Sequence, residues 1–298
     1  MPPFQRLCAP ALIAVGLLAG PVNGASAEGR ACPIVNTLTG RPDPAHFVSP
    51  PEANNDDKAP IPCNSCADPA NISQKTCGVY RFLNSEACAI GHCADGQGEF
   101  VFHKEDGRDF ALQYDTRYRN PARFPKARGE NCRFLVWATQ PVVGIEDTNT
   151  FAGRNYWLDA YLASQTLVEP PFPRDDLALA IQPATTRGQH QFHIHIGTLL
   201  PAYRTALAGL DPTSTRLSVN GYDFRVRFLK VGSGKTPFEG VDLFSIVRDM
   251  LPARATDLPD YGVLAAVTDG GTGIWVLAAR RFDRIQLNYR QKEECRLR

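Results

Sequence analysis

Polar and apolar residues alternate most regularly in the run Gln-His-Gln-Phe-His-Ile-His-Ile, residues 189–196. A period of two predicts a strand, because successive side chains of a strand point to opposite faces of its sheet. The polar residues that would share one face are Gln191, His193 and His195. The apolar residues that would share the other are Phe192, Ile194 and Ile196. We therefore expect one face of this strand to join the core and the other to carry chemistry.

Other segments predict strands and helices around this one. Apolar and alternating runs predict strands at residues 99–103, 109–114, 133–138 and 177–181, within 217–231, and on both sides of a turn at 269–271. Apolar residues at helical spacing predict helices at residues 156–167, 202–210 and 241–251. The strand at 177–181 would return through a turn at 185–188 as the histidine strand, which predicts an α+β fold with an antiparallel sheet.

The N-terminus has the pattern of an export signal. Arg6 precedes an apolar run at residues 9–20, and the small residues Ala25-Ser26-Ala27 stand before Glu28. The run is short for a membrane span, which needs roughly 20 apolar residues, although a retained anchor is an open alternative. We therefore divide the chain into a signal or anchor at residues 1–27, an extension at 28–95 and a catalytic domain at 96–298.

The extension at residues 28–95 is rich in proline and cysteine. Prolines interrupt regular backbone ladders, so we expect mostly loops there. Of the nine cysteines, Cys8 falls in the signal and an even number remains, which in an exported chain predicts disulfides. Zinc is the alternative, because the pairs Cys63/Cys66 and Cys88/Cys93 resemble ligand spacings.

The balance of basic and acidic residues argues against one class of partner. The chain has 32 basic and 31 acidic residues, and loss of residues 1–27 would remove Arg6 and leave 31 of each. Nucleic-acid binding normally needs a basic face, so we expect no nucleic-acid partner.

Three interpretations of the histidine strand compete. The two imidazoles could be ordinary residues of a half-exposed strand, since histidine is common at intermediate burial. They could be metal ligands, but a catalytic zinc takes three protein ligands and the strand supplies two. They could also perform nucleophilic catalysis, in which a neutral imidazole attacks phosphorus.

A family resemblance favours the third interpretation. The three polar slots, with Gln191 first and His193 and His195 after it, resemble the histidine-triad superfamily of nucleotidyl hydrolases and transferases. Within that superfamily, the sequence of residues 189–196 resembles that of the CDP-diacylglycerol pyrophosphatase family. The further segments that support the match are Gly144-Ile145-Glu146-Asp147 with Asn155-Tyr156-Trp157, Leu179-Ala180-Ile181-Gln182, and Tyr261-Gly262-Val263 with Trp275-Val276-Leu277-Ala278. The resemblance covers roughly residues 96–298.

The resemblance implies a histidine-triad-like antiparallel sheet with flanking helices and a specific reaction. CDP-diacylglycerol and water would give CMP and phosphatidate through a nucleotidyl intermediate on His193. His195 and Gln191 would position the ring and the phosphate oxygens, and Gln182 and Gln189, before and after the turn, would bind substrate. This chemistry needs no metal or other cofactor. CDP-diacylglycerol would be met at a membrane surface, with the protein in the periplasm or on the periplasmic face of the inner membrane.

Two alternatives stay open. The histidine strand alone does not choose a leaving group, so the enzyme could hydrolyse another nucleoside diphosphate derivative in the periplasm. With glutamine in the first slot, the chain could also be an inactive binding protein stapled by disulfides.

Overall fold

The structure is a computed structural model. It describes residues 35–36, 41–42, 66, 77–84, 92–95, 98–103, 110–115, 131–140, 142–145, 154–184, 186–189, 191–251, 260–282, 287–288, 290–291 and 296–297. The predicted export signal and most of the extension at residues 28–95 lie outside these ranges.

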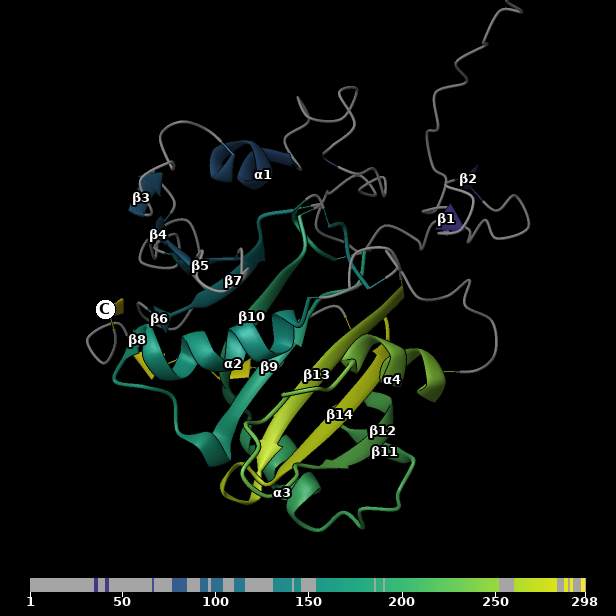
Figure 1. The fold of residues 1–298 in the computed structure, drawn as a ribbon. Coiled ribbons are helices and arrows are strands. Elements are labelled where there is room, and N and C mark those ends of the chain that lie inside the picture. The colour runs from purple at the N-terminus through teal and green to yellow at the C-terminus, as the bar shows by residue number, and fades with distance from the viewer. Residues whose placement is uncertain are drawn as a thin grey trace, which may run out of the picture.

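A large antiparallel sheet organises the described chain (Figure 1). Its strands lie in the order β11 (Arg216–Val219), β12 (Tyr222–Lys230), β14 (Gly273–Arg280), β13 (Tyr261–Thr268), β9 (Leu177–Ile181), β10 (His193–Leu199), β7 (Phe134–Ala138), β5 (Phe110–Asp115), β4 (Gly98–His103) and β3 (His92–Asp95). β15 (Leu287–Asn288) pairs with β10 at Thr198 and Leu199. The predicted α+β class and antiparallel sheet are confirmed.

Short strand pairs accompany the main sheet. They are β1 (Val35–Asn36) with β2 (Arg41–Pro42), β6 (Asn131–Cys132) with β16 (Arg290–Gln291), and β8 (Val168–Glu169) with β17 (Arg296–Leu297). Single 3-10 turns, η5 (Arg174–Asp176) and η7 (Asp269–Gly271), lie before β9 and between β13 and β14. The pairs of β6 with β16 and of β8 with β17 bring residues 290–297 beside two earlier segments, residues 131–132 and 168–169.

The helices are α1 (Gly78–Leu83), α2 (Tyr156–Thr166), α3 (Pro201–Ala208) and α4 (Leu243–Met250). Buried side chains of α2 and α4 pack with Ile194 and Ile196 on one face of the sheet. Tyr203 and Leu207 of α3 pack on the opposite face. The predicted helices at 156–167, 202–210 and 241–251 are confirmed with slightly shorter bounds, and the sheet lies between helices on both sides (Figure 1).

The first turns of α2 and α4 are set by capping side chains. Asn155 accepts a hydrogen bond from the Leu158 backbone N–H at 3.0 Å and donates to the carbonyl oxygens of Phe238 and Val241. Asp242 accepts one from the Ser245 backbone N–H at 3.0 Å. Such caps satisfy backbone donors that a helix start leaves without intrahelical partners. Asn155 therefore also fixes α2 against the segment that leads into α4.

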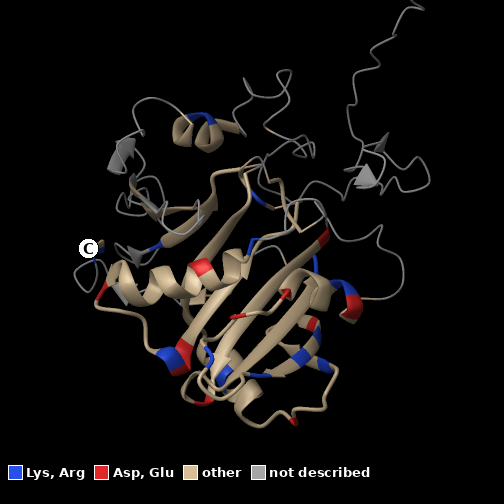
Figure 2. Cartoon of the chain, in the orientation of Figure 1, with Lys and Arg blue, Asp and Glu red and all other residues tan. Residues whose placement is uncertain are grey.

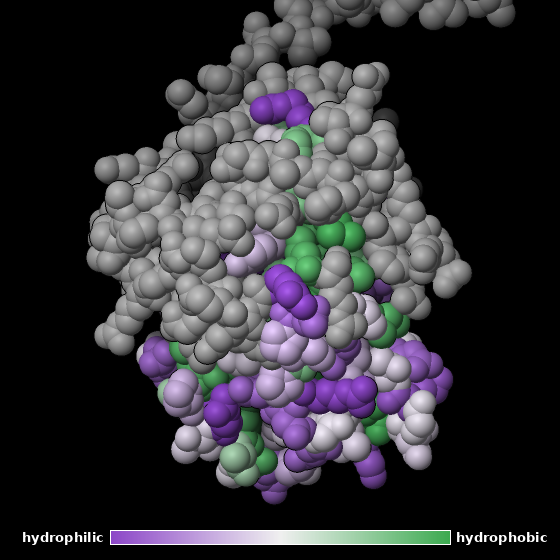
Figure 3. Space-filling view, turned by 90° about the vertical axis from the view of Figure 1, so that its left-hand side faces the viewer, coloured by the Kyte–Doolittle hydropathy of each residue, from purple (hydrophilic) through white to green (hydrophobic). Residues whose placement is uncertain are grey.

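The surface of the described part mixes charge and hydrophobicity. Lysines and arginines lie on several of the described elements, as do aspartates and glutamates (Figure 2). On the face shown in Figure 3, hydrophobic side chains gather near the middle of the view above a hydrophilic region. Among the described residues, the helices are all too short or too polar to cross a membrane.

Cys66 and Cys77 form a disulfide immediately before α1. The bond agrees with the prediction of disulfides, and it pairs Cys66 with Cys77 rather than leaving it beside Cys63 as a zinc ligand. α1 packs Val79 and Leu83 on the sheet beside Phe100 and Trp137. The disulfide thus anchors a helix that covers part of the face carrying the histidines.

Candidate functional site

The histidine strand has the predicted alternation. β10 begins at His193, and Ile194 and Ile196 enter the core beneath α2 and α4. His193 and His195 project to the opposite face, where they are directly opposite Trp137 and Leu135 of β7 in the strand register. Both residues are more deeply buried than a half-exposed strand would give: His193 is 7% exposed and His195 0%.

The two histidines lie between separate apolar clusters on their face of the sheet. One cluster holds Leu135 and Trp137 beneath α1, and the other holds Ala178 and Ala180 with α3. The histidine rings are tilted by 55°, with centroids 5.0 Å apart. The polar groups therefore occupy a narrow strip in an otherwise hydrophobic surface.

Two contacts fix the ring of His193. Its Nδ1 lies 2.9 Å from the backbone carbonyl oxygen of Gln191. A carbonyl oxygen can only accept a hydrogen bond, so Nδ1 carries the proton and the lone pair of the neutral ring is on Nε2. On its face, the ring stacks on the indole of Trp137, with centroids 4.2 Å apart and planes 29° apart. An imidazole with its lone pair on Nε2 is a competent nucleophile.

The side chain of Gln191 holds the backbone beside the pocket. Its amide nitrogen donates to the carbonyl oxygens of Ala138 and Gln140, the latter at 2.5 Å. Backbone bonds from Ala138 N–H to the Phe192 carbonyl and from Phe192 N–H to the Val142 carbonyl, at 3.0 and 2.7 Å, join the same segments. Within the described part of the chain, the side-chain oxygen of Gln191 accepts no hydrogen bond. Gln191 thus ties the end of β7 to the start of β10.

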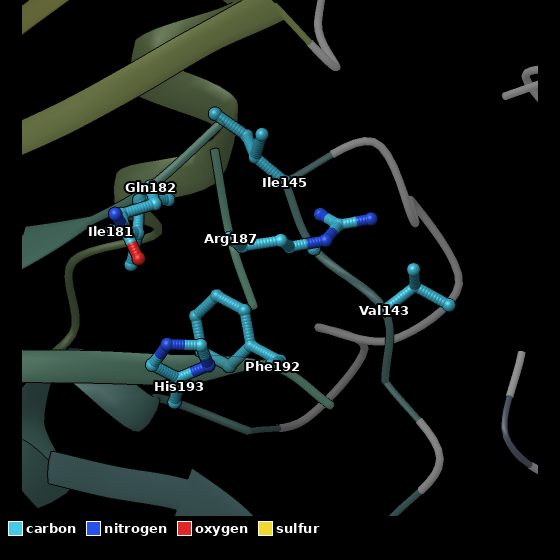
Figure 4. A pocket seen from close by; sticks show the side chains of 8 residues that line it. Val143, Ile145, Ile181, Gln182, Arg187, Phe192 and His193 are labelled. Atoms are coloured by element: carbon cyan, nitrogen blue, oxygen red, sulfur yellow. The ribbon is translucent and has the colours of Figure 1, made fainter. Parts of the chain in front are cut away.

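A pocket opens where β9 ends and β10 begins (Figure 4). It encloses about 220 Å³, including space open to solvent. Its lining comes from residues 143–145, the end of β9, the β9–β10 connection and the start of β10: Val143, Gly144, Ile145, Ile181, Gln182, Arg187, Phe192 and His193. Three polar side chains of different chemistry, an imidazole, a carboxamide and a guanidinium, therefore face one largely apolar hollow.

Arg187 supplies a positive charge to this pocket. It is only 3% exposed. In the view of Figure 4 its guanidinium lies on the side of Val143 and Ile145, while Gln182 and His193 lie on the other side. This arrangement suits an anionic group that spans the pocket.

The predicted site residues lie in three different places. His193 and Gln182 line the pocket. His195 and Gln191 are buried beside it and are not among the described lining residues. Gln189 lies apart, where its side-chain oxygen accepts a hydrogen bond from the Val79 backbone N–H of α1 at 3.2 Å.

Sequence reasoning missed Arg187 and Trp137. The sequence places Arg187 in a turn, where a charged residue is usually solvated. Its position in the connection that leads into the histidine strand is the available signal. The sequence places Trp137 in an apolar strand, and its contact with His193 depends on a strand register that sequence does not give. Among the described residues, no three histidine, cysteine, aspartate or glutamate side chains gather as a metal-ligand group.

Comparison with known proteins identifies the family. The sequence model of the family described as CDP-diacylglycerol pyrophosphatase matches residues 118–296. The chain is similar to a CDP-diacylglycerol pyrophosphatase of Yersinia pestis, with 28% identity over 187 residues that cover 58% of this chain and 70% of that protein. It is 35% identical over 91 residues to proteins of that name from Mycobacterium bovis and Mycobacterium tuberculosis, a match that covers 29% of this chain and 35% of each relative. The family match spans more than half of the chain and confirms the resemblance found in its motifs. The chain belongs to the CDP-diacylglycerol pyrophosphatase family.

Proposed function

We propose that this protein hydrolyses CDP-diacylglycerol to CMP and phosphatidate, with His193 as the nucleophile. The family name supports the substrate and the reaction. The observation that carries the mechanism is the contact of 2.9 Å between His193 Nδ1 and the Gln191 carbonyl oxygen, because it assigns the lone pair to Nε2 of a ring that lines the pocket. A histidine-triad-like fold is part of the proposal, supported by the antiparallel sheet and the Gln191, His193 and His195 slots.

The reaction proceeds in two displacements. Nε2 of His193 attacks the cytidylyl phosphorus, a P–N bond forms, and the bond from that phosphorus to the bridging oxygen breaks. Phosphatidate leaves with the electron pair of that bond. Water then attacks the same phosphorus, the P–N bond breaks, and CMP departs while the proton of the water passes to solvent. The imidazole returns to its neutral form with the proton on Nδ1.

Arg187 and Gln182 bind phosphate oxygens in this proposal. A guanidinium forms strong charge-assisted hydrogen bonds to phosphate, and placed donors stabilise the charge that develops during transfer. The polar side chains that line the pocket are the ones that bind phosphate oxygens in this proposal. The pocket therefore receives the pyrophosphate, while the nucleoside and the acyl chains extend beyond it.

The reaction would take place at a membrane surface outside the cytoplasm. The acyl chains of the substrate require a lipid phase. The Cys66–Cys77 disulfide supports an oxidising compartment such as the periplasm, in agreement with the export pattern of residues 1–27. We propose that the protein acts in the periplasm or on the periplasmic face of the inner membrane.

The direct test is turnover by the purified protein. CDP-diacylglycerol in mixed micelles should give CMP and phosphatidate, CDP-choline should be a poor substrate, and His193→Gln should be inactive while it remains folded. Because the reaction needs no metal, turnover should persist in EDTA. Preferential hydrolysis of CDP-choline would contradict the lipid substrate. Loss of turnover in EDTA and its return with zinc would contradict the histidine mechanism.

A further inference from the structure

The indole of Trp137 that stacks on His193 also makes a hydrogen bond at its edge. Trp137 Nε1 donates a hydrogen bond to Gln113 Oε1 at 2.8 Å, and both side chains are buried. In the register of β5 and β7, Trp137 is opposite Ala111, and Gln113 is opposite Leu135. Gln113 is thus the diagonal neighbour of Trp137, within reach of long side chains. The small side chain of Ala111 leaves space for the indole.

The three side chains form a continuous series across neighbouring strands. β5 contributes Gln113, β7 contributes Trp137, and β10 contributes His193, which is directly opposite Trp137. The hydrogen bond fixes the rotation of the indole about its side-chain bonds. The indole in turn presents its face to the imidazole at a centroid distance of 4.2 Å.

We propose that Gln113 and Trp137 are positioning residues that hold the His193 imidazole in its attacking orientation. The Gln191 carbonyl fixes one edge of the ring through Nδ1, and a single hydrogen bond still allows the ring plane to rock. The indole face restricts that rocking, so Nε2 keeps its direction. This inference rests on the proposed function, since it assigns His193 as the nucleophile.

A purely structural role for the pair makes a different prediction. A buried indole N–H needs an acceptor wherever it lies, so Gln113 could serve stability alone. Gln113→Leu leaves that N–H buried without its acceptor, whereas the double variant Gln113→Leu/Trp137→Phe removes both partners. Replacing both partners by apolar groups of similar shape can be nearly neutral for stability. The double variant therefore separates stability from ring position.

The experiment measures kcat, KM and unfolding for both variants, together with the ring resonances of His193 in protein labelled with 13C and 15N at histidine. His193→Gln assigns those resonances. We expect Gln113→Leu to lower kcat on the order of 10- to 100-fold, because displacement of a reacting group by about 1 Å can cost about 100-fold. KM should change little. The double variant should regain stability but not kcat, and in both variants the His193 resonances should shift.

Trp275→Phe is the matched control, because Trp275 is a buried tryptophan of β14 on the same sheet, packed against Phe228 away from the histidines. It should leave kcat and the His193 resonances unchanged. Wild-type resonances and kcat in the double variant would overturn the positioning role. Failure of wild-type protein to hydrolyse CDP-diacylglycerol would refute the proposed function. The resonances are recorded without substrate, so they test the position of the His193 ring independently of that result.

Discussion

Nδ1 of His193 lies 2.9 Å from the carbonyl oxygen of Gln191, two residues earlier in the chain. The contact is local, but its geometry depends on the surrounding fold. The Gln191 side chain is bound to the end of β7, and β10 begins immediately afterwards. A glutamine in the first polar slot can therefore serve the nucleophile through its backbone carbonyl while its side chain fixes that carbonyl in place.

Gln191→Met should lower both stability and turnover. Methionine has a similar size but cannot donate to the Ala138 and Gln140 carbonyls, and the Ala138 carbonyl would then be buried without this donor. We expect a loss of about 1–3 kcal/mol in the free energy of unfolding, measured by urea denaturation, and a fall in kcat because the Gln191 carbonyl shifts. A higher KM for CDP-diacylglycerol with unchanged stability would instead show that the side chain contacts substrate.

Arg187→Met should weaken catalysis strongly. Methionine keeps much of the apolar bulk but removes the guanidinium from the pocket. A charge-assisted hydrogen bond contributes about 1.5–3 kcal/mol, so kcat/KM should fall by roughly 10- to 100-fold. Arg187→Lys should recover little, because lysine lacks the planar fork that matches phosphate.

The matched control for the two Arg187 variants is Arg204→Met. Arg204 is an exposed arginine that pairs with Asp176 at 2.5 Å. Its replacement removes the same charge at a position that does not line the pocket, so steady-state kinetics should not change. Equal losses of kcat/KM in the Arg187 and Arg204 variants would contradict a local phosphate contact.

Removal of the Cys66–Cys77 disulfide should destabilise the chain. The bond closes a short loop, with a sequence separation of 11 residues, and such a closure stabilises by about 2–3 kcal/mol in the chain-entropy account. The double variant Cys66→Ser/Cys77→Ser should unfold at lower urea concentration. Mass mapping of the unreduced wild-type protein should recover the linked peptides. Two alkylatable thiols at these positions would show that the bond does not form.

The cap of α4 should give stability that depends on pH. Although partial burial favours the neutral acid, hydrogen bonds from Ser245 and the nearby Arg248 hold the pKa of Asp242 below its usual 3.8. Its contribution is therefore complete above the unfolded-state pKa and disappears as pH falls through the lower folded-state pKa.

Asp242→Ala should accordingly cost about 1 kcal/mol at neutral pH. Urea denaturation of both proteins at several pH values should show a gap that narrows below the usual aspartate pKa of 3.8. A gap that widens toward acid would have the wrong sign for a cap of this kind.

Strong periodicity made most of the fold predictable. The alternation at residues 189–196 predicted a strand, which the structure has at His193–Leu199, and the apolar runs at 133–138 and 177–181 predicted β7 and β9. The turn at 185–188 predicted the hairpin of β9 and β10. The turn residues 269–271 likewise lie between β13 and β14. These features are local, so the sequence contains the information that specifies them.

The site was predictable only where it depends on the same local order. His193 and Gln182 meet in one pocket because the β9–β10 hairpin places them there. The deep burial of His195 and the stack of Trp137 on His193 depend instead on how β7 aligns with β10. That register joins segments far apart in the chain, and alternation alone fits more than one alignment.

The most direct measurement is capture of the covalent intermediate. The protein is mixed with CDP-diacylglycerol labelled in the cytidylyl phosphate, quenched in alkaline denaturant, which preserves phosphorus–nitrogen bonds, and digested for peptide mapping. We predict label on His193 within the peptide that contains residues 191–196, and none in His193→Gln. Label on any other residue, or full turnover by His193→Gln, would contradict the account.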